Sequence, residues 1–214
     1  MKILTGLCAL TLLFASCSSV KQQKSDKWIS LFDGKTLNGW KKNQNPETFS
    51  VENGTIKVAG PVSHLFYDGS VNAHNFKNFE FKAQVMTKPG ANSGIYFHTV
   101  FHQEGFPDKG YEVQVNNSHT DWRRTGSLYA VQDVKETYVK DNEWYEEYIM
   151  VQGKNVTIKI NGKTVVEYTE PDEIASKNAG GRGISSGTFA LQGHDPGSVI
   201  YYKDIMVRPL PDTN

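Results

Sequence analysis

Three short segments of the sequence, at residues 95–98, 111–116 and 189–194, alternate apolar and polar side chains. Because successive side chains of a β-strand point to opposite faces, the polar members of each segment are expected on one face. These polar members are Tyr96, His98, Glu112, Gln114, Asn116, Gln192 and His194. Their carboxylate, amide, imidazole and phenol groups offer the donors and acceptors that sugar hydroxyls need. If the strands are neighbours, the sequence predicts one polar patch that binds a carbohydrate.

A polar sheet face can also be a solvated surface without a binding role. Solvated faces usually carry Lys, Glu and Thr, as the strand with Thr157 and Lys159 does. A mixture of Tyr, His, Gln and Asn around a single carboxylate is less typical of such a surface. The composition of the patch therefore favours a binding face.

The loop between the Glu112 strand and Tyr129 offers further contacts. Trp122 provides a plane on which a sugar ring can stack. Asp121 and Arg124 are expected to form hydrogen bonds with sugar hydroxyl groups, and Tyr129 adds a phenol. In the alternative interpretation, Trp122 packs on the rim of the fold. Asp121 and Arg124 then form a surface ion pair, which contributes little to stability. The sequence leaves both interpretations open.

The distribution of carboxylates argues against one common mechanism of sugar cleavage. A retaining glycosidase needs two carboxyl groups about 5 Å apart, and acidic residues at alternate positions of one strand would provide them. Glu112 is followed at these positions by Gln114 and Asn116. The sequence therefore disfavours ordinary glycoside hydrolysis by a carboxylate pair.

The elements that must position these residues are strands. From Trp28 to Leu210 apolar residues recur with period two between tight turns, and no long helical stripe is present. Expected strands span residues 48–52, 55–58, 79–85, 94–101, 111–116, 147–152, 156–161, 164–168, 188–194 and 199–209, with one helical turn near 172–176. The pair Asn53-Gly54 predicts a hairpin turn because both residues tolerate positive φ. This pattern predicts an all-β fold, a two-sheet antiparallel sandwich in one domain.

The N-terminus predicts export. An apolar stretch begins behind one lysine and is shorter than the roughly 20 residues of a membrane-spanning helix, which is typical of a signal peptide. The small residues before Cys17 resemble the lipobox of bacterial lipoproteins. Residues 1–16 are therefore predicted to be a lipoprotein signal peptide, Cys17 the lipidated residue, and residues 17–27 a tether to the domain at 28–210. The alternative is ordinary cleavage that leaves Cys17 unmodified.

The charge balance and the cysteines limit the partners and the compartment. The chain has 23 basic and 23 acidic residues, and the basic ones are scattered. Nucleic-acid binding is excluded because no basic stripe is available to neutralise phosphates. Cys8 and Cys17 are the two cysteines of the chain, so the domain is predicted to hold no disulfide. The lack of acidic residues just after Cys17 favours an anchor in the outer membrane that faces the periplasm.

Several motifs carry a family resemblance. They lie at residues 28–40 (WISLFDGKTLNGW), 92–97 (NSGIYF), 110–115 (GYEVQV), 125–129 (TGSLY) and 191–194 (LQGH). In this order, across Trp28–Leu210, they resemble the 3-keto-disaccharide hydrolase domain family. The resemblance implies a jelly-roll sandwich of the concanavalin A-like lectin/glucanase type. In such proteins an Arg often follows the Tyr-Phe pair, where this sequence has His98.

The resemblance also implies an activity, the cleavage of glycosides already oxidised to a ketone at C3, by hydrolysis or by elimination and hydration. The ketone acidifies the C2 proton, so one base can remove it and expel the C1 substituent. We expect His194 or His98 to be the base and Glu112 the partner acid or orienting group. The other expected substrate contacts are Tyr96, Gln114, Asp121, Trp122, Arg124, Tyr129, Gln192 and Asp195.

The cofactor and the partners stay open at this stage. A divalent metal is one option, with Glu112, Asp195 and the histidines as candidate ligands, but their spacing does not establish a site. The expected partners are the 3-keto-glycoside substrate, the membrane through the N-terminal lipid, and a sugar oxidoreductase that makes the ketone. Two alternatives from other classes are a non-catalytic carbohydrate-binding lipoprotein and a purely structural envelope domain.

Overall fold

The computed structural model describes residues 27–177 and 181–212 of the 214-residue chain. The expected signal peptide at residues 1–16, Cys17 and all of the expected tether except Lys27 lie outside the described residues. Within the described part of the chain, no helix is long and apolar enough to cross a membrane.

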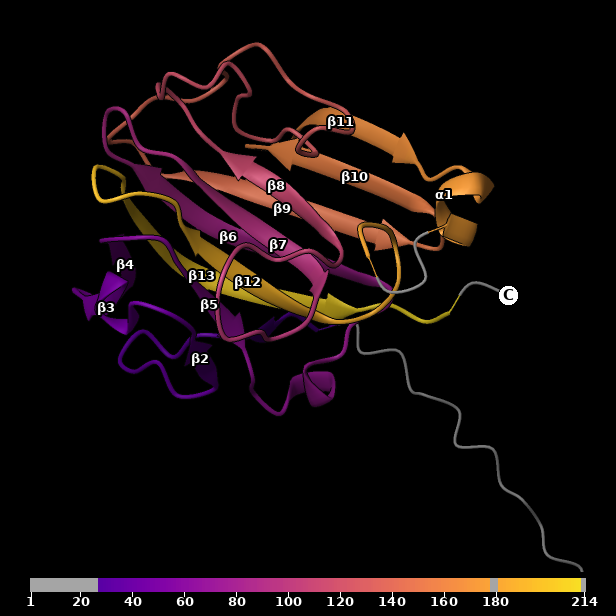
Figure 1. The fold of residues 1–214 in the computed structure, drawn as a ribbon, viewed down its shortest axis with the longest axis horizontal. Helices are drawn as coiled ribbons and strands as arrows, with labels where there is room; N and C mark the ends of the chain where they lie inside the picture. Colours follow the sequence, from indigo (N-terminus) through magenta and orange to yellow (C-terminus); the bar gives the residue numbers. More distant parts are fainter. Residues whose placement is uncertain (1–26, 178–180, 213–214) are drawn as a thin grey trace, which may run out of the picture.

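Two antiparallel sheets pack face to face, which confirms the predicted all-β sandwich (Figure 1). The larger sheet has the strand order β11 (Lys163–Thr169), β10 (Asn155–Ile160), β9 (Tyr145–Gln152), β6 (Phe79–Thr87), β13 (Val199–Pro209), β4 (Thr55–Ala59) and β3 (Phe49–Glu52), and β1 (Ile29–Ser30) also pairs with β13. The smaller sheet has the order β2 (Trp40–Lys42), β5 (Ser63–Tyr67), β12 (Thr188–Gly193), β7 (Ser93–Thr99) and β8 (Tyr111–Val115). Short helices connect some of these strands: η1 (Pro46–Thr48), η2 (Val71–His74) and α1 (Asp172–Lys177).

The two sheets enclose the main core of the domain, because the apolar members of each alternating strand point between them. Phe189 of β12 illustrates the packing. Its ring centroid lies 4.9 Å from that of Phe79 and 4.7 Å from that of Phe81, both on β6 of the opposite sheet. All three side chains are fully buried. Each such burial contributes roughly 1.5–3 kcal/mol, so these contacts hold the smaller sheet on the larger one.

All the strands expected from the sequence are present, with small shifts of their ends, and α1 lies where one helical turn was expected. Three further strands were not predicted, namely β1, β2 and β5. All the side chains of β5 are buried, so this strand shows no alternation of apolar and polar residues. Its outward members, His64 and Phe66, are covered by the rings of Phe106 and Phe101 from the loop after β7.

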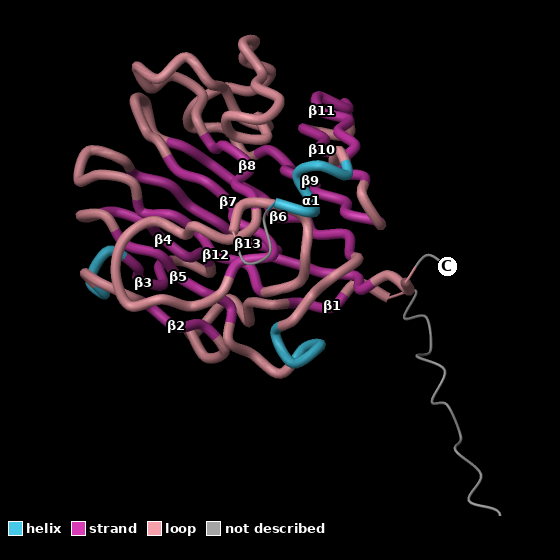
Figure 2. The backbone as a smooth tube through the Cα atoms, turned by 45° about the vertical axis from the view of Figure 1, so that its right-hand side comes forward, coloured by secondary structure: helices cyan, strands magenta, loops and turns pink. Residues whose placement is uncertain are grey.

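The strand order of the smaller sheet brings the three predicted polar segments together, because β7 lies between β12 and β8. Tyr96 of β7 lies opposite Ala190 of β12 on one side and Glu112 of β8 on the other. Since Ile95 and Phe97 belong to the core, Tyr96 points away from it. Long loops connect β7 to β8 and β8 to β9, and residues 181–187 lead into β12 (Figure 2).

Candidate active site

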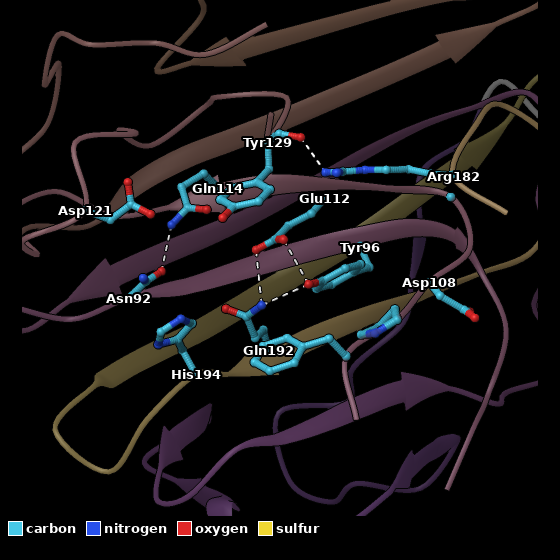
Figure 3. A pocket seen from close by; sticks show the side chains of 13 residues that line it. Asn92, Tyr96, Asp108, Glu112, Gln114, Asp121, Tyr129, Arg182, Gln192 and His194 are labelled. Carbon is cyan, nitrogen blue, oxygen red and sulfur yellow. Dashed lines mark hydrogen bonds between the residues drawn. The ribbon is translucent and has the colours of Figure 1, made fainter. Parts of the chain in front are cut away.

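The outer face of the smaller sheet carries a cavity of about 460 Å³ (Figure 3). Strands β7, β8 and β12 form its floor, and residues from the two long loops and from the segment 181–187 form its walls. The lining residues are Asn92, Tyr96, Phe106, Pro107, Asp108, Gly110, Glu112, Gln114, Asp121, Tyr129, Arg182, Gln192 and His194. The structure therefore brings together seven of the residues expected from the sequence: Tyr96, Glu112, Gln114, Asp121, Tyr129, Gln192 and His194.

Glu112 is held by two neighbours on the cavity floor. The Tyr96 hydroxyl donates a hydrogen bond of 2.8 Å to Oε2 of Glu112. The Gln192 amide Nε2 donates to Oε1 of Glu112 at 3.1 Å and to the Tyr96 hydroxyl at 3.0 Å. Gly94 makes room for this arrangement, because a Cβ atom at Gly94 would lie 2.3 Å from Glu112 Oε1. The carboxyl group is therefore fixed in one position over the sheet.

The environment of Glu112 changes its acidity. Burial raises the pKa of Glu112 to about 7, although the hydrogen bond from Tyr96, the positive charge of Arg182 and the hydrogen bond from Gln192 each lower it. Burial dominates because a charged carboxylate loses its hydration there. Near neutral pH the group therefore exists in both protonation states, which suits a residue that gives and accepts a proton.

His194 lies at the end of β12 and is oriented by Asp195. The imidazole Nδ1 lies 2.9 Å from Oδ2 of Asp195, which also accepts a hydrogen bond of 2.7 Å from the Ser198 hydroxyl. Burial raises the pKa of Asp195, but hydrogen bonds from Ser198, His194 and the Gly197 backbone outweigh it, and the pKa lies below its usual value. An ionised Asp195 places the imidazole proton on Nδ1, so Nε2 keeps a lone pair and is available as a base.

The side-chain amides of Gln114 and Gln192 both line the cavity. Nε2 of Gln114 donates a hydrogen bond of 2.7 Å to Oδ1 of Asn92. The Oε1 atoms of Gln114 and Gln192 are buried, and neither has a hydrogen-bond partner among the described residues. Buried polar atoms are usually paired, so these two acceptors fit donors that a ligand brings, such as sugar hydroxyls.

Arg182 adds a cation to the wall of the cavity and was not predicted from the sequence. Its guanidinium donates a hydrogen bond to the backbone oxygen of Tyr129, and its Cζ lies 5.6 Å from the centroid of the Tyr129 ring. Arg182 lies in the glycine-rich segment Gly181-Arg182-Gly183, which carries no periodic pattern. Asn92, Phe106, Pro107 and Asp108 were missed as well, since they lie in loops where no periodic pattern marks them.

His98 does not share the face of Tyr96, contrary to the expectation from strict alternation. Its φ is +57°, at the end of β7, which turns the side chain out of the regular strand arrangement. The ring packs against Phe79, with the centroids 5.6 Å apart. Nε2 of His98 donates to the Lys77 backbone oxygen at 2.9 Å, and Nδ1 accepts from the Ser185 backbone nitrogen at 3.1 Å. His98 therefore lies outside the cavity with both ring nitrogens engaged.

Three other expected contacts also lie outside the cavity lining. Arg124 donates hydrogen bonds of 2.8 and 2.9 Å to the backbone oxygens of His119 and Asp121, so it shapes the loop. Trp122 is 47% exposed on the rim, with the Arg123 guanidinium 4.8 Å from its ring centroid. Asp195 is not part of the lining, and it affects the cavity by orienting the imidazole of His194. Asp121 lines the cavity as expected, but its ion-pair partner is Arg123, with Nη1 3.5 Å from Oδ1.

The candidate metal ligands do not come together in one site within the described residues. Within residues 27–177 and 181–212, no group of three or more His, Cys, Asp or Glu side chains is arranged to hold a metal ion. Glu112 is surrounded by hydrogen-bond donors, and Asp195 by the donors of its own turn. The donor set of the cavity therefore does not fit a metal site, and the chemistry below is derived from side chains.

Comparison with known proteins identifies the family. The family described as the 3-keto-alpha-glucoside-1,2-lyase-like domain matches residues 27–208, which confirms the resemblance predicted from the motifs. A protein of Bacteroides thetaiotaomicron named 3-keto-disaccharide hydrolase is 30% identical over 171 residues. The match covers 67% of this chain and 59% of the relative, so the chain spans about three fifths of that protein's length.

Solved structures share the fold. A crystal structure from Parabacteroides distasonis, of a candidate glycosyl hydrolase, aligns with a TM-score of 0.70 at 22% identity and covers 86% of this chain and 94% of its own. The carbohydrate binding module CBM66 from Bacillus subtilis aligns with a TM-score of 0.56 at 12% identity and covers 79% of this chain and 95% of its own. These similarities confirm the predicted jelly-roll sandwich.

Proposed function

Since the chain belongs to the 3-keto-alpha-glucoside-1,2-lyase-like domain family, we propose that it cleaves glycosides whose sugar carries a ketone at C3. The observation that carries this proposal is the pairing of two groups in one cavity. His194 presents a base nitrogen that Asp195 orients, and Glu112 is a buried carboxyl with a raised pKa. A reaction that removes one proton and supplies another needs such a pair.

The proposed reaction begins at C2, whose hydrogen is acidified by the neighbouring ketone. Nε2 of His194 takes this proton, and the electron pair of the C2–H bond forms an enolate. The enolate then forms a C1=C2 double bond and expels the C1 substituent, whose oxygen receives a proton from Glu112. Water then adds across the double bond. Its oxygen bonds to C1 and its proton returns to the Glu112 carboxylate, while the His194 imidazolium, after exchange with the solvent, gives a proton to C2. The sum of these steps is hydrolysis of the glycosidic bond.

The other cavity residues have roles that follow from their chemistry. The Arg182 guanidinium provides a positive charge for the developing enolate oxygen, and such fixed charge is often a large part of catalysis. The unpaired Oε1 atoms of Gln114 and Gln192 accept hydrogen bonds from sugar hydroxyls. Tyr96 and Gln192 hold the Glu112 carboxyl toward the leaving group. Because the ketone supplies the driving force, no second catalytic carboxylate is needed.

The direct test is one incubation of the purified chain with 3-keto-disaccharides and with their unoxidised parents, each with and without a chelator. Released monosaccharide is measured by chromatography. We expect release from the keto form alone, and no effect of the chelator. Binding of both forms without release would contradict the proposal and support a non-catalytic carbohydrate-binding protein instead.

We also propose that the chain is a lipoprotein of the cell envelope, anchored in the outer membrane through Cys17, and that a sugar oxidoreductase supplies its substrate. The apolar stretch and the small residues before Cys17 support the anchor. In a bacterial host fed labelled palmitate, the full chain should take up label and its Cys17→Ser variant should not. An unlabelled full chain would contradict the anchor without affecting the proposed reaction.

A further inference from the structure

A second cavity of about 460 Å³ lies on the outer face of the smaller sheet. Its lining includes Lys41, Phe66, Asp68, Thr99, Phe101 and Lys109. None of these residues belongs to the first cavity, and the proposed reaction uses none of them. The second cavity differs from the first in its place on the sheet and in the charges of its lining.

The register of the sheet places the two cavities side by side. Lys41 pairs with Phe66, Phe66 with Ala190, Ala190 with Tyr96, and Tyr96 with Glu112. This row crosses the whole sheet, with the first cavity at its Glu112 end and the second at its Lys41 end. Phe66 and Tyr96 are two strands apart, about 10 Å, which is comparable with the length of a disaccharide.

Two loops contribute to both cavities. In the loop after β7, Phe106 lines the first cavity, whereas Phe101 and Lys109 line the second. In the loop before β12, Arg182 lines the first cavity and Ser186 the second. Between the two cavities, Phe66, Tyr96, Ala190 and Phe101 form a small apolar cluster, so a ligand that occupies both cavities passes over this cluster between the same two loops.

The second cavity carries an excess of positive charge. The Lys109 ammonium donates a hydrogen bond of 3.1 Å to the Ser186 backbone oxygen, and the Lys41 ammonium lies 3.7 Å from the centroid of the Phe101 ring. In the part of the chain that the structure describes, neither ammonium group forms an ion pair with a carboxylate. The acid of the cavity, Asp68, has its Oδ1 3.8 Å from Nε2 of His74. The lining therefore carries two lysine ammonium groups and one aspartate carboxylate.

Thr99 places a buried hydroxyl group in the lining of the same cavity. Thr99 is 1% exposed, and its Oγ1 has no hydrogen-bond partner among the described residues. An unpaired buried hydroxyl is costly unless a ligand or water satisfies it. Together with the two ammonium groups, it provides a donor set for an oxyanion.

We propose that the second cavity binds an anionic substituent, a carboxylate or a sulfate, on the leaving group of the glycoside that is cleaved in the first cavity. The link to a leaving group rests on the proposed function. The anion site itself rests on Lys41, Lys109 and Thr99. The substrate class that it defines is an acidic 3-keto-disaccharide, with the ketone in the first cavity and the acidic residue in the second.

The test compares three 3-keto-disaccharides that differ only in the leaving sugar: neutral, carboxylated at C6, and sulfated at C6. The acidic substrates should show a KM about tenfold lower than the neutral one. Lys41→Ala and Lys109→Ala should abolish this advantage and leave turnover of the neutral substrate unchanged. Lys35→Ala is the matched control, an exposed lysine outside both cavities. Equal KM values for all three substrates in the parent chain would overturn the inference while the proposed function stands.

A binding measurement separates failure of the inference from failure of the function. Calorimetry with unoxidised acidic disaccharides should show binding that is weakened about tenfold by Lys41→Ala, by Lys109→Ala and, to a smaller extent, by Thr99→Val. Such binding without any turnover of keto substrates would overturn the proposed function and retain the anion site. Binding that does not differ between acidic and neutral disaccharides would overturn the anion site. Comparison of carboxylate with sulfate identifies which anion the site prefers.

Discussion

Tyr96 and Glu112 lie directly opposite each other on β7 and β8, and the Tyr96 hydroxyl donates a hydrogen bond of 2.8 Å to Oε2 of Glu112. Burial raises the pKa of Glu112 to about 7, and the hydrogen bond from Tyr96 opposes this rise. The pair therefore determines the pH range in which Glu112 holds its proton. In the proposed reaction this proton goes to the leaving group, so the pair also determines the pH range of activity.

Substitution Tyr96→Phe tests this relationship. It removes a hydrogen bond that favours the charged carboxylate, so the pKa of Glu112 should rise above about 7. Glu112 acts in its protonated form, so activity falls as pH rises through this pKa. The descending limb of kcat/KM against pH should therefore move upward by about one pH unit. The control is Tyr138→Phe, which removes a surface hydrogen bond of 2.8 Å to Glu136. A limb that does not move would contradict the assignment of Glu112 as the acid.

Substitution Asp195→Asn tests the orientation of the base. The amide no longer favours the proton on Nδ1 of His194, so Nε2 loses its availability as a base. We expect kcat to fall by a factor of about a hundred or more, with little change in KM. The control is Asp204→Asn at an exposed position of β13. Both constants are measured by steady-state kinetics on a 3-keto-disaccharide. An unchanged kcat in Asp195→Asn would show that Asp195 does not orient the base.

Substitution Gly94→Ala tests the position of the Glu112 carboxyl. The new Cβ would lie 2.3 Å from Oε1 and 2.7 Å from Cγ of Glu112, so the flexible side chain has to move away. A displacement of this size costs up to about a hundredfold in kcat. The control is Gly181→Ala, where a Cβ meets nothing within 4 Å. The melting temperatures of both variants should lie close to that of the parent chain. Full activity of Gly94→Ala would mean that the observed carboxyl position is not the active one.

Glu147 links stability to pH independently of the reaction. It is fully buried, neither carboxyl oxygen has a hydrogen-bond partner among the described residues, and burial raises its pKa well above the usual 4.5. The folded state keeps the proton that the unfolded chain releases above pH 4.5, so this group makes stability fall as pH rises from there toward its folded pKa. The loss is about 1.4 kcal/mol per pH unit.

Substitution Glu147→Gln removes this ionisation. In urea denaturation at a series of pH values from 5 upward, the free energy of unfolding of the variant should rise relative to that of the parent chain as pH rises, by up to about 1.4 kcal/mol per pH unit until the folded pKa of Glu147 is reached. Glu146→Gln, at a neighbouring position with 34% of the side chain exposed, serves as the control and should show no such trend. A difference between Glu147→Gln and the parent that stays constant with pH would contradict the raised pKa.

The sandwich and the floor of the site were predictable because both depend on period two. Alternation placed Tyr96, Glu112, Gln114 and Gln192 on one face, and the register of β12, β7 and β8 brings them together. The same rule failed for His98, since a φ of +57° breaks the alternation at the end of the strand. The sequence does not mark that change, because His adopts a positive φ in only a small minority of its occurrences.

The walls of the site were not predictable for a different reason. Arg182 and Phe106 come from loops, whose path depends on contacts with distant parts of the chain, such as the hydrogen bond from Arg182 to the Tyr129 backbone. Strand β5 was missed because a strand buried on both faces has no periodic pattern. The second cavity depends on both of these features, so it appears in the structure alone.

The central claim is that cleavage proceeds by removal of the C2 proton of a 3-keto-glycoside. The most direct measurement is cleavage of a 3-keto-disaccharide in D2O, followed by NMR of the released 3-keto sugar, with the same sugar incubated without protein as the control for spontaneous exchange. We expect deuterium at C2 of the product, because the hydrogen added to C2 after elimination comes from the solvent. Cleavage that leaves the original hydrogen on C2 would contradict it.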